Sequence, residues 1–189
     1  MAERWQKPKR FDRNLIVIGA GSAGLVSAYI ASMVKAKVTL VEAHDMGGDC
    51  LNFGCVPSKA LIASGKAAYG QAHAAAYGVA DVVPQVDYAA AKDHVASVIA
   101  QIEPVDSQER FEGLGVQVIR EYGKFISPTE VEAGEYRIKA RRVVISTGSA
   151  PFVPPIPGLD TVPYETNETL FELREQPAHL LVIGGGPIG

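Results

Sequence analysis

The sequence predicts an α/β protein in which helices cover a parallel β-sheet, followed by a small antiparallel β-meander and the start of a second unit of the first kind. Three observations support this prediction. An apolar strand at 14–18 leads through a glycine-rich turn into a helix at 22–34 and a second strand at 37–41. The hydrophobic period later shifts from that of helices towards the period of two that is typical of strands. Finally, residues 181–189 repeat the pattern of residues 16–24.

The first half of the chain is expected to be mainly helical. The strand–helix–strand unit should be parallel and right-handed. Residues 46–56 form a predicted loop, and Pro57 should open the next helix because proline is favoured at a first helical position. The remaining expectations here are a helix to residue 69, an irregular stretch at 72–84, a helix at 88–102 broken at Pro104, and a helix at 106–112 ended by Gly113 and Gly115.

The second half is expected to contain short strands. They are predicted at 116–119, 123–126, 130–132, 136–139 and 142–146, followed by a short helix at 169–173 and a strand at 180–183. Four prolines at 151–158 indicate a stiff connector. We therefore predict a basic tail at 1–13, a nucleotide-binding domain at 14–150, a connector at 151–179, and the first strand and glycine loop of a second such domain at 180–189.

The composition is that of an ordinary globular protein. Of the 189 residues, 47% are hydrophobic and 21% are charged, and the net charge is -3. These values favour neither a nucleic-acid partner nor an acidic membrane surface. The apolar run from Leu15 to Val34 has the length of a membrane span, but three glycines divide it into a strand and a helix. We expect a soluble cytoplasmic protein.

The first glycine motif lies between a strand and a helix. Gly19 would make the tight turn, Gly21 would let a pyrophosphate approach the backbone, and Gly24 would let the helix pack close to the strand. The start of a helix attracts phosphate through unpaired N–H groups and a partial positive charge. Glu42 ends the second strand, where an acidic residue binds both ribose hydroxyls of a dinucleotide. The alternative is a glycine-rich turn with a surface glutamate.

Cys50 and Cys55 are the only cysteines of the chain. Residues five apart on a regular helix lie about 8–9 Å apart, too far for a disulfide, so a bridge requires a departure that Gly54 would permit. The helix start at Pro57 and the charge of Lys59 should lower the pKa of Cys55. Two alternatives are a pair of unrelated buried cysteines and a metal site, although the histidines show no ligand spacing; they are His44, His73, His94 and His179.

Three segments resemble one family. Residues 47–59 (GGDCLNFGCVPSK) are similar to the active-site signature of class I pyridine nucleotide-disulfide oxidoreductases, which include dihydrolipoamide dehydrogenase, glutathione reductase and mercuric reductase. Residues 143–151 resemble the family's second flavin motif, and residues 183–189 resemble the opening of its NAD(P)H domain. The resemblance implies a Rossmann-like FAD-binding domain that leads into a Rossmann-like NAD(P)H domain.

The resemblance also implies roles for single residues. Cys55 would be the flavin-side thiol, Cys50 the interchange thiol, and Lys59 a residue that tunes the flavin. Electrons would pass from NAD(P)H through FAD to the Cys50–Cys55 disulfide and then to the substrate, and no resident metal is implied. The FAD contacts would be Gly19, Ala20, Gly21, Ser22, Ala23, Gly24, Glu42, Gly48, Lys59, Gly123, Ser146, Thr147 and Gly148. NAD(P)H would meet Gly184, Gly186 and Gly189.

Other features leave the substrate open. Residues 46–50 and 166–171 resemble mercuric-reductase-like sequences, so the implied substrate is a small disulfide or dithiol, or a metal ion. Asp49 stands where the family often has threonine, and a carboxylate would be unfavourable beside phosphates unless it points away. The family's C-terminal parts lie beyond Gly189, so we expect this front part of the enzyme not to turn over alone, and the full-length protein to be a homodimer.

Two alternative functions are weighed against this one. A bare FAD-binding module for sensing or assembly would keep the glycine loop and Glu42, but would not need Cys50, Cys55 and Lys59 together. A dehydrogenase that uses NAD alone would leave the cysteine signature unexplained.

Overall fold

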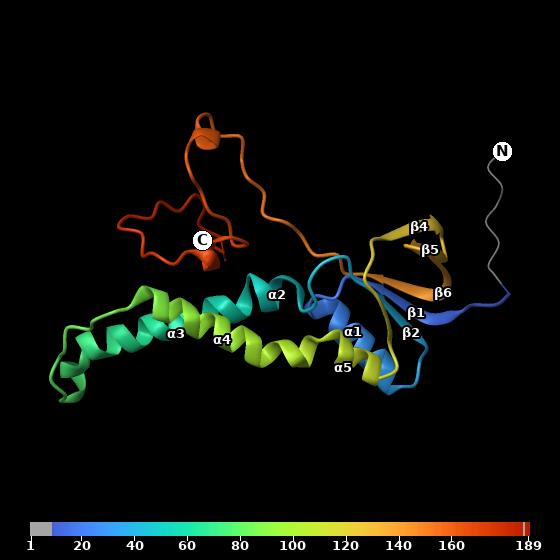
Figure 1. Ribbon diagram of the computed structural model, residues 1–189, viewed down its shortest axis with the longest axis horizontal. Coiled ribbons are helices and arrows are strands. Elements are labelled where there is room, and N and C mark those ends of the chain that lie inside the picture. The colour runs from blue at the N-terminus through green and yellow to red at the C-terminus, as the bar shows by residue number, and fades with distance from the viewer. Residues whose placement is uncertain (1–8, 187) are drawn as a thin grey trace. The chain divides into compact units, whose positions relative to one another are not determined.

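The computed structural model describes residues 9–186 and 188–189. It divides into two compact units. The first contains Met1–Gly48 and Glu103–Ser149, and the second contains Asp49–Ile102 and Ala150–Gly189. The helices and strands of both units are labelled in Figure 1.

The first unit contains a six-stranded sheet with the strand order β3-β2-β1-β6-β5-β4. Its parallel part consists of β3 (Gln117–Ile119), β2 (Val38–Val41), β1 (Arg13–Ile18) and β6 (Tyr136–Ile145). The antiparallel part joins β6 to β5 (Glu130–Ala133) and β4 (Gly123–Ser127). The predicted combination of a parallel sheet with a small antiparallel meander is therefore confirmed.

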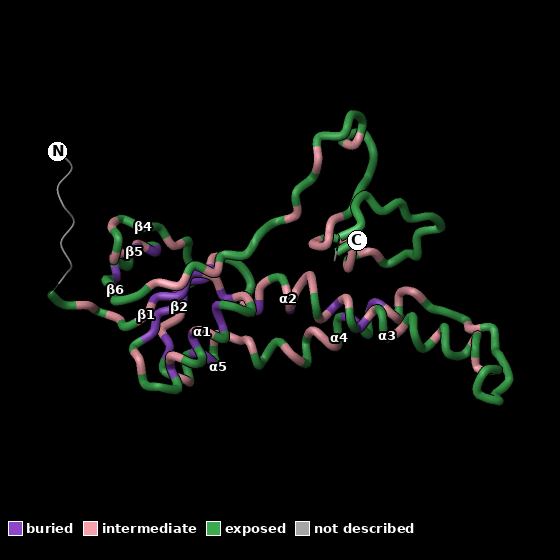
Figure 2. Tube along the Cα trace, turned by 180° about the vertical axis from the view of Figure 1, so that it is seen from behind, coloured by how far each residue is buried: buried purple, intermediate pink, exposed green. Residues whose placement is uncertain are grey.

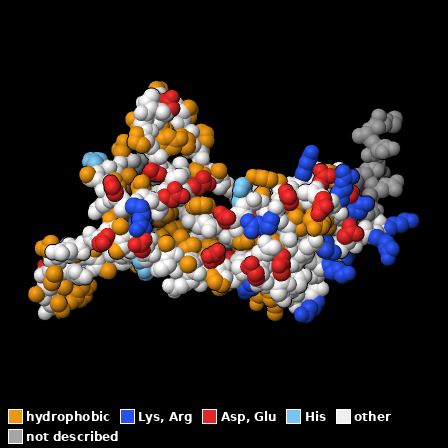
Figure 3. Space-filling view, viewed as in Figure 1, with side chains coloured by type: hydrophobic (Ala, Val, Ile, Leu, Met, Phe, Trp, Pro, Cys, Tyr) orange, Lys and Arg blue, Asp and Glu red, His pale blue; other side chains and the backbone are white. Residues whose placement is uncertain are grey.

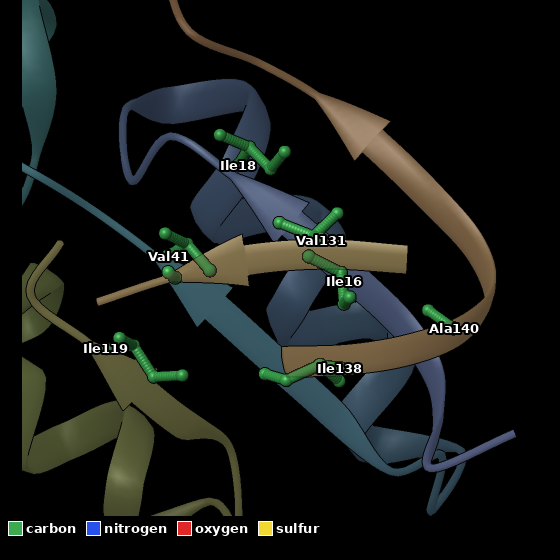
Figure 4. Close-up of a cluster of buried hydrophobic side chains, with 8 residues drawn as sticks. Ile16, Ile18, Val41, Ile119, Val131, Ile138 and Ala140 are labelled. Carbon is green, nitrogen blue, oxygen red and sulfur yellow. The ribbon is translucent and has the colours of Figure 1, made fainter. Parts of the chain in front are cut away.

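The central strand β1 supplies side chains to two hydrophobic clusters, because successive residues of a strand point to opposite faces. Ile16 and Ile18 join the cluster that β5 and β6 cover, in which Val131 and Ile138 lie close to them (Figure 4). Val17 joins the other cluster, which packs under α1 (Ser22–Met33) and α5 (Gln108–Gly113). Figure 2 shows the buried trace concentrated on β1, β2 and α1. The carboxyl ends of β1 and β2 are thus held rigidly.

The second unit is mainly helical. Its long helices are α3 (Cys55–Ala72) and α4 (Tyr88–Asp106), whose last residues belong to the first unit. The shorter elements are α2 (Gly48–Asn52), η1 (Ala74–Tyr77), η2 (Leu159–Thr161) and η3 (Leu170–Glu172). Among its buried residues are Leu51, Pro57, Ala60 and Val95.

Several helix boundaries differ from those predicted. Residues 46–56 are not simply a loop, since α2 begins at Gly48 and α3 begins at Cys55. Pro57 is the third residue of α3, a position that proline tolerates because N–H groups of the first turn have no partner within the helix. Pro104 does not break α4, which continues through it to Asp106. Ser107 then caps α5 by accepting a hydrogen bond from the Arg110 backbone N–H at 3.2 Å.

Two strand predictions were also wrong. The strands expected at 136–139 and 142–146 are a single strand, β6, which pairs with β5 in its first part and with β1 in its second. This switch of partners gives β6 a mixed burial pattern that conceals its continuity in the sequence. Residues 180–183 form no strand and are exposed. A strand exists only where a neighbour accepts and donates its hydrogen bonds, and the described residues supply no such neighbour there.

The surface differs between the two units. In the first, Lys and Arg side chains gather over the sheet (Figure 3), where β6 carries Arg137, Lys139, Arg141 and Arg142. In the second, the turn between α3 and α4 exposes apolar side chains, with Tyr77 and Val83 each 88% exposed. None of the helices in the described residues has both the length and the apolar character needed to cross a bilayer.

Candidate functional site

The first glycine loop follows β1 directly and leaves no room for a side chain at Gly19 or Gly24. Gly19 has φ +102, a left-handed value that favours glycine, and a Cβ there would overlap the Ser146 carbonyl oxygen. A Cβ on Gly24 would overlap the Gly19 carbonyl oxygen, so α1 packs tightly against the end of β1. The structure thus gives both residues the tight contacts that the motif predicts.

Gly21 and Gly48 bring two backbones together beside this loop. A Cβ on Gly48 would lie 2.6 Å from the Gly21 Cα, and Gly48 has φ +56. The Gly47 N–H donates to the Ala20 carbonyl at 3.0 Å and fixes the approach. Ser22 and Ala23 open α1 and are exposed, and no side chain caps this helix start or places an acid in its first turn. An uncapped helix start next to a bare backbone suits a pyrophosphate.

Glu42 lies just beyond β2 and is 9% exposed. One carboxylate oxygen accepts from the Ala20 backbone N–H at 2.5 Å, and the other accepts from the His44 backbone N–H at 2.8 Å. A carboxylate offers about four lone-pair positions, so each oxygen keeps capacity for a further donor such as a ribose hydroxyl. The residues around Glu42 therefore fit the adenosine half of a dinucleotide.

Ser146 and the residues after it lie beside the same loop. The Ser146 hydroxyl donates to the carbonyl oxygens of Ile18 and Gly19, at 2.9 and 3.0 Å. Thr147 and Gly148 are exposed, and Gly148 has φ +68. Gly123 opens β4, and a Cβ there would lie 3.2 Å from the Ile18 side chain. Ser146 thus positions the glycine loop, and Gly123 packs against the strand before it.

A cluster that the sequence reasoning missed lies at the ends of β2 and β3. The Tyr122 hydroxyl is 3.0 Å from Nε2 of His44, and their rings meet edge to face at a centroid distance of 5.4 Å. The Arg120 guanidinium donates to the His44 carbonyl. The only sequence signal was the position of His44 two residues after Glu42, because Tyr122 is 78 residues away along the chain.

The two cysteines lie in the second unit as free thiols, with Cys55 exposed and Cys50 partly buried. Their side chains are hydrogen bonded to each other. This bond and the charge of Cys50 raise the pKa of Cys55, and burial adds to the rise, while the cation of Lys59 acts in the opposite direction. The expected lowering of the Cys55 pKa was therefore wrong, because the second thiol outweighs the lysine.

Asp49 is exposed, and its carboxylate has two contacts within the second unit. Its Oδ1 accepts a hydrogen bond from the Asn167 side-chain amide at 2.9 Å. Its Oδ2 lies 2.6 Å from the position that a Cβ on Gly54 would take. Gly54 thus matters because its missing side chain makes room for this carboxylate.

The second glycine motif has the local geometry of the first without its secondary structure. Gly184 has φ +117, and a Cβ on Gly189 would overlap the Gly184 carbonyl oxygen, as one on Gly24 would overlap that of Gly19. Gly186 is exposed, and Pro187 lies outside the described residues. Within the described part of the chain, no group of three or more His, Cys, Asp or Glu side chains is arranged to hold a metal ion.

Comparison with known proteins agrees with this geometry. The family model for pyridine nucleotide-disulphide oxidoreductases matches residues 13–189. The chain belongs to this family. Its members share the Rossmann-like fold described above. The Cu(II) complex of the HOCl-induced flavoprotein disulfide reductase RclA from Escherichia coli superposes with a TM-score of 0.66 at 25% identity, over 85% of this chain and 34% of that one.

Curated relatives of the family carry several names. A mercuric reductase of Bacillus cereus is 34% identical over 95% of this chain and 28% of its own length. A dihydrolipoyl dehydrogenase of Synechocystis is 34% identical over 95% of this chain, and a glutathione reductase of Burkholderia cepacia is 33% identical over 95%. The chain spans 39% of the length of each of the last two. Membership of this oxidoreductase family implies the use of flavin and pyridine nucleotide.

Proposed function

We propose that this chain is the FAD-binding and dithiol part of an NAD(P)H-dependent flavoprotein disulfide reductase. FAD, when bound, would supply the passage of electrons between a nicotinamide and the Cys50–Cys55 pair. The reduced Cys50–Cys55 pair would then reduce a small disulfide or a metal ion. The names of the relatives support this range of substrates without selecting one. The family's further domains would complete the enzyme as a homodimer, and the sparse cysteines suit a reducing cytoplasm.

The residues of the first unit would bind and orient the cofactor. The start of α1 at Ser22 would face the pyrophosphate, and Glu42 would accept from the ribose hydroxyls with the lone pairs that Ala20 and His44 leave open. Ser146 holds the turn at Gly19 in the required shape. The remaining FAD contacts of this proposal are Gly21, Ala23, Gly24, Gly48, Gly123, Thr147 and Gly148.

The residues of the second unit would carry the thiol chemistry. Cys50 would attack the substrate, and Cys55 would be the thiol beside the flavin, with a pKa that the hydrogen bond to Cys50 raises. Lys59 favours the Cys55 thiolate through its charge. Gly184, Gly186 and Gly189 would begin the site for NAD(P)H.

One observation carries the proposal: two free thiols are hydrogen bonded to each other at the junction of α2 and α3, in a chain whose β1–α1 turn fits a dinucleotide. A module used only for FAD binding has no need of a paired dithiol. A structural cysteine pair would be buried, whereas Cys55 is exposed.

The test is a visible spectrum of the purified chain loaded with FAD, recorded during anaerobic reduction by dithiothreitol. We expect a long-wavelength charge-transfer band between the Cys55 thiolate and oxidised flavin. The Cys55→Ser variant should bind FAD and lack this band, while Cys50→Ser should show it without added reductant. Identical spectra for wild type and Cys55→Ser would refute the enzyme proposal in favour of a plain FAD-binding module.

A further inference from the structure

The carboxylate of Asp49 lies against Gly54, the residue directly before Cys55. Asp49 directly precedes Cys50 and Gly54 directly precedes Cys55, so this contact joins the residues next to the two hydrogen-bonded thiols. A second bond, from the Phe53 N–H to the Asp49 carbonyl at 2.9 Å, keeps this turn closed. The carboxylate of Asp49 is thus held against the backbone one residue before Cys55.

Asn167 fixes the other oxygen of this carboxylate from a distant part of the chain. The segment 166–174 that presents Asn167 is itself anchored. Lys92 is 3% exposed, and its ammonium donates to the Leu170 carbonyl at 3.1 Å, with the centroid of the Phe171 ring 5.0 Å from its nitrogen. Arg174 binds Asp93 at 2.6 Å. Asn167 therefore offers its amide from a segment held on α4, which favours one position of the Asp49 carboxylate.

We infer that Asp49, held by Asn167, shifts the thiol–disulfide equilibrium of Cys50 and Cys55 towards the disulfide. A reduced pair that has lost one proton is an anion, whereas the disulfide is neutral. A neighbouring carboxylate repels the anion and leaves the disulfide unaffected, so it destabilises only the reduced form. Asn167 is a positioning residue in this scheme. The inference rests on the proposed function, since it assumes that the pair is redox-active.

The effect should depend on pH, because it needs a thiolate. Thiols in general ionise at about pH 8.5 and are protonated at about pH 6, so the repulsion should be stronger at about pH 8.5 than at about pH 6. The other charged groups on α3, on α4 within the second unit and on the segment 166–174 are Lys59, Lys66, Lys92, Asp93, Glu168, Glu172 and Arg174. They stay unchanged in the variants below, so they contribute equally to every comparison.

The test measures the equilibrium constant with glutathione on the full chain. Oxidised glutathione accepts the electron pair: its S–S bond breaks, the Sγ–Sγ bond between Cys50 and Cys55 forms, and the two thiol protons pass to the two glutathione sulfurs. Samples are equilibrated anaerobically in glutathione buffers, quenched with acid and alkylated. Mass spectrometry then gives the fractions of chain in the dithiol and disulfide forms. We expect Asp49→Asn to lower the constant for disulfide formation about three- to tenfold at pH 8.5 and less than about twofold at pH 6.

Further variants separate position from charge. Asn167→Ala should also lower the equilibrium constant for disulfide formation, because the Asp49 carboxylate is then free to turn into water. The double variant should resemble Asp49→Asn alone, since both changes remove one interaction. Glu165→Gln, which removes an exposed carboxylate from the chain just before this segment, is the matched control and should stay within about twofold of wild type.

Two results would overturn the inference alone: a constant for Asp49→Asn equal to that of wild type at pH 8.5, or an equal change at both pH values, which would indicate a purely structural effect. Failure of the wild-type cysteines to form any intramolecular disulfide would overturn the proposed function together with the inference. Far-UV circular dichroism of each variant verifies that the fold is kept.

Discussion

Gly24 allows the most direct test of the cofactor loop, through the substitution Gly24→Ala. Besides overlapping the Gly19 carbonyl oxygen, the new Cβ would lie 2.8 Å from the Ser146 Oγ and 2.9 Å from the Gly19 carbonyl carbon. The Gly19 oxygen cannot withdraw easily, because the Gly19 N–H is bonded to the Val41 carbonyl at 2.8 Å and the oxygen itself accepts from Ser146. The methyl group must therefore push α1 away from the end of β1.

The change in the free energy of unfolding caused by Gly24→Ala is the sum of two opposing effects. Overpacking at a rigid site typically costs about 1–3 kcal/mol, while alanine in place of glycine inside a helix stabilises by about 1 kcal/mol. Gly113→Ala in α5 supplies a matched control in the same unit, because a Cβ there has nothing within 4 Å. We expect Gly113→Ala to be neutral or stabilising by up to about 1 kcal/mol, and Gly24→Ala to be less stable than it by about 1–3 kcal/mol.

Urea unfolding, followed by far-UV circular dichroism, gives the free energy of unfolding of each variant from the midpoint and slope of its transition. Gly24→Ala should also weaken FAD binding, because displacement of α1 moves the helix start at Ser22. Equal stability and equal flavin affinity of the two variants would refute the argument that Gly24 sets the helix–strand distance.

Three other perturbations follow from the same geometry. Glu42→Gln places an amide donor against the backbone N–H of Ala20 or of His44, so we expect FAD affinity, measured by quenching of flavin fluorescence, to fall about tenfold or more; unchanged affinity would contradict the role of Glu42. Lys59→Met should raise the Cys55 pKa and Cys50→Ser should lower it, as read from alkylation rates against pH; shifts in the opposite directions would show that the two charges do not act as described. Burial lowers the Lys92 pKa below its ordinary value of 10.5, so the unfolded chain binds more protons there, and stability should rise with pH as that value is approached from below. Lys92→Met should remove this rise in urea unfolding series, and a slope that persists in the variant would assign it to another group.

The strand–helix–strand part of the fold was predictable because its signals are local. Val17 and its neighbours form an unbroken apolar run, glycines interrupt it at fixed spacing, and Glu42 follows at the expected distance. The continuity of β6 was not predictable in the same way. Its two halves pair with different strands, so the burial pattern changes along it and imitates two separate elements.

The environment of the thiols depended on contacts that spacing does not encode. The pKa of Cys55 is decided by the proximity of the Cys50 thiol, and the sequence only showed that a straight helix would keep the two apart. Asp49 was recognised as unusual, but its partner Asn167 is 118 residues away and lies in a segment with no periodic signal. Such pairs become visible only when tertiary structure brings the segments together.

Treatment of the reduced wild-type chain with oxidised glutathione, followed by measurement of its intact mass and free thiols, shows whether Cys50 and Cys55 form a redox-active dithiol. We expect the loss of two hydrogen atoms and of both free thiols, with a disulfide between Cys50 and Cys55 and no retained glutathione. A chain that keeps both thiols, or that ends as a stable mixed disulfide with glutathione at either cysteine, would contradict it.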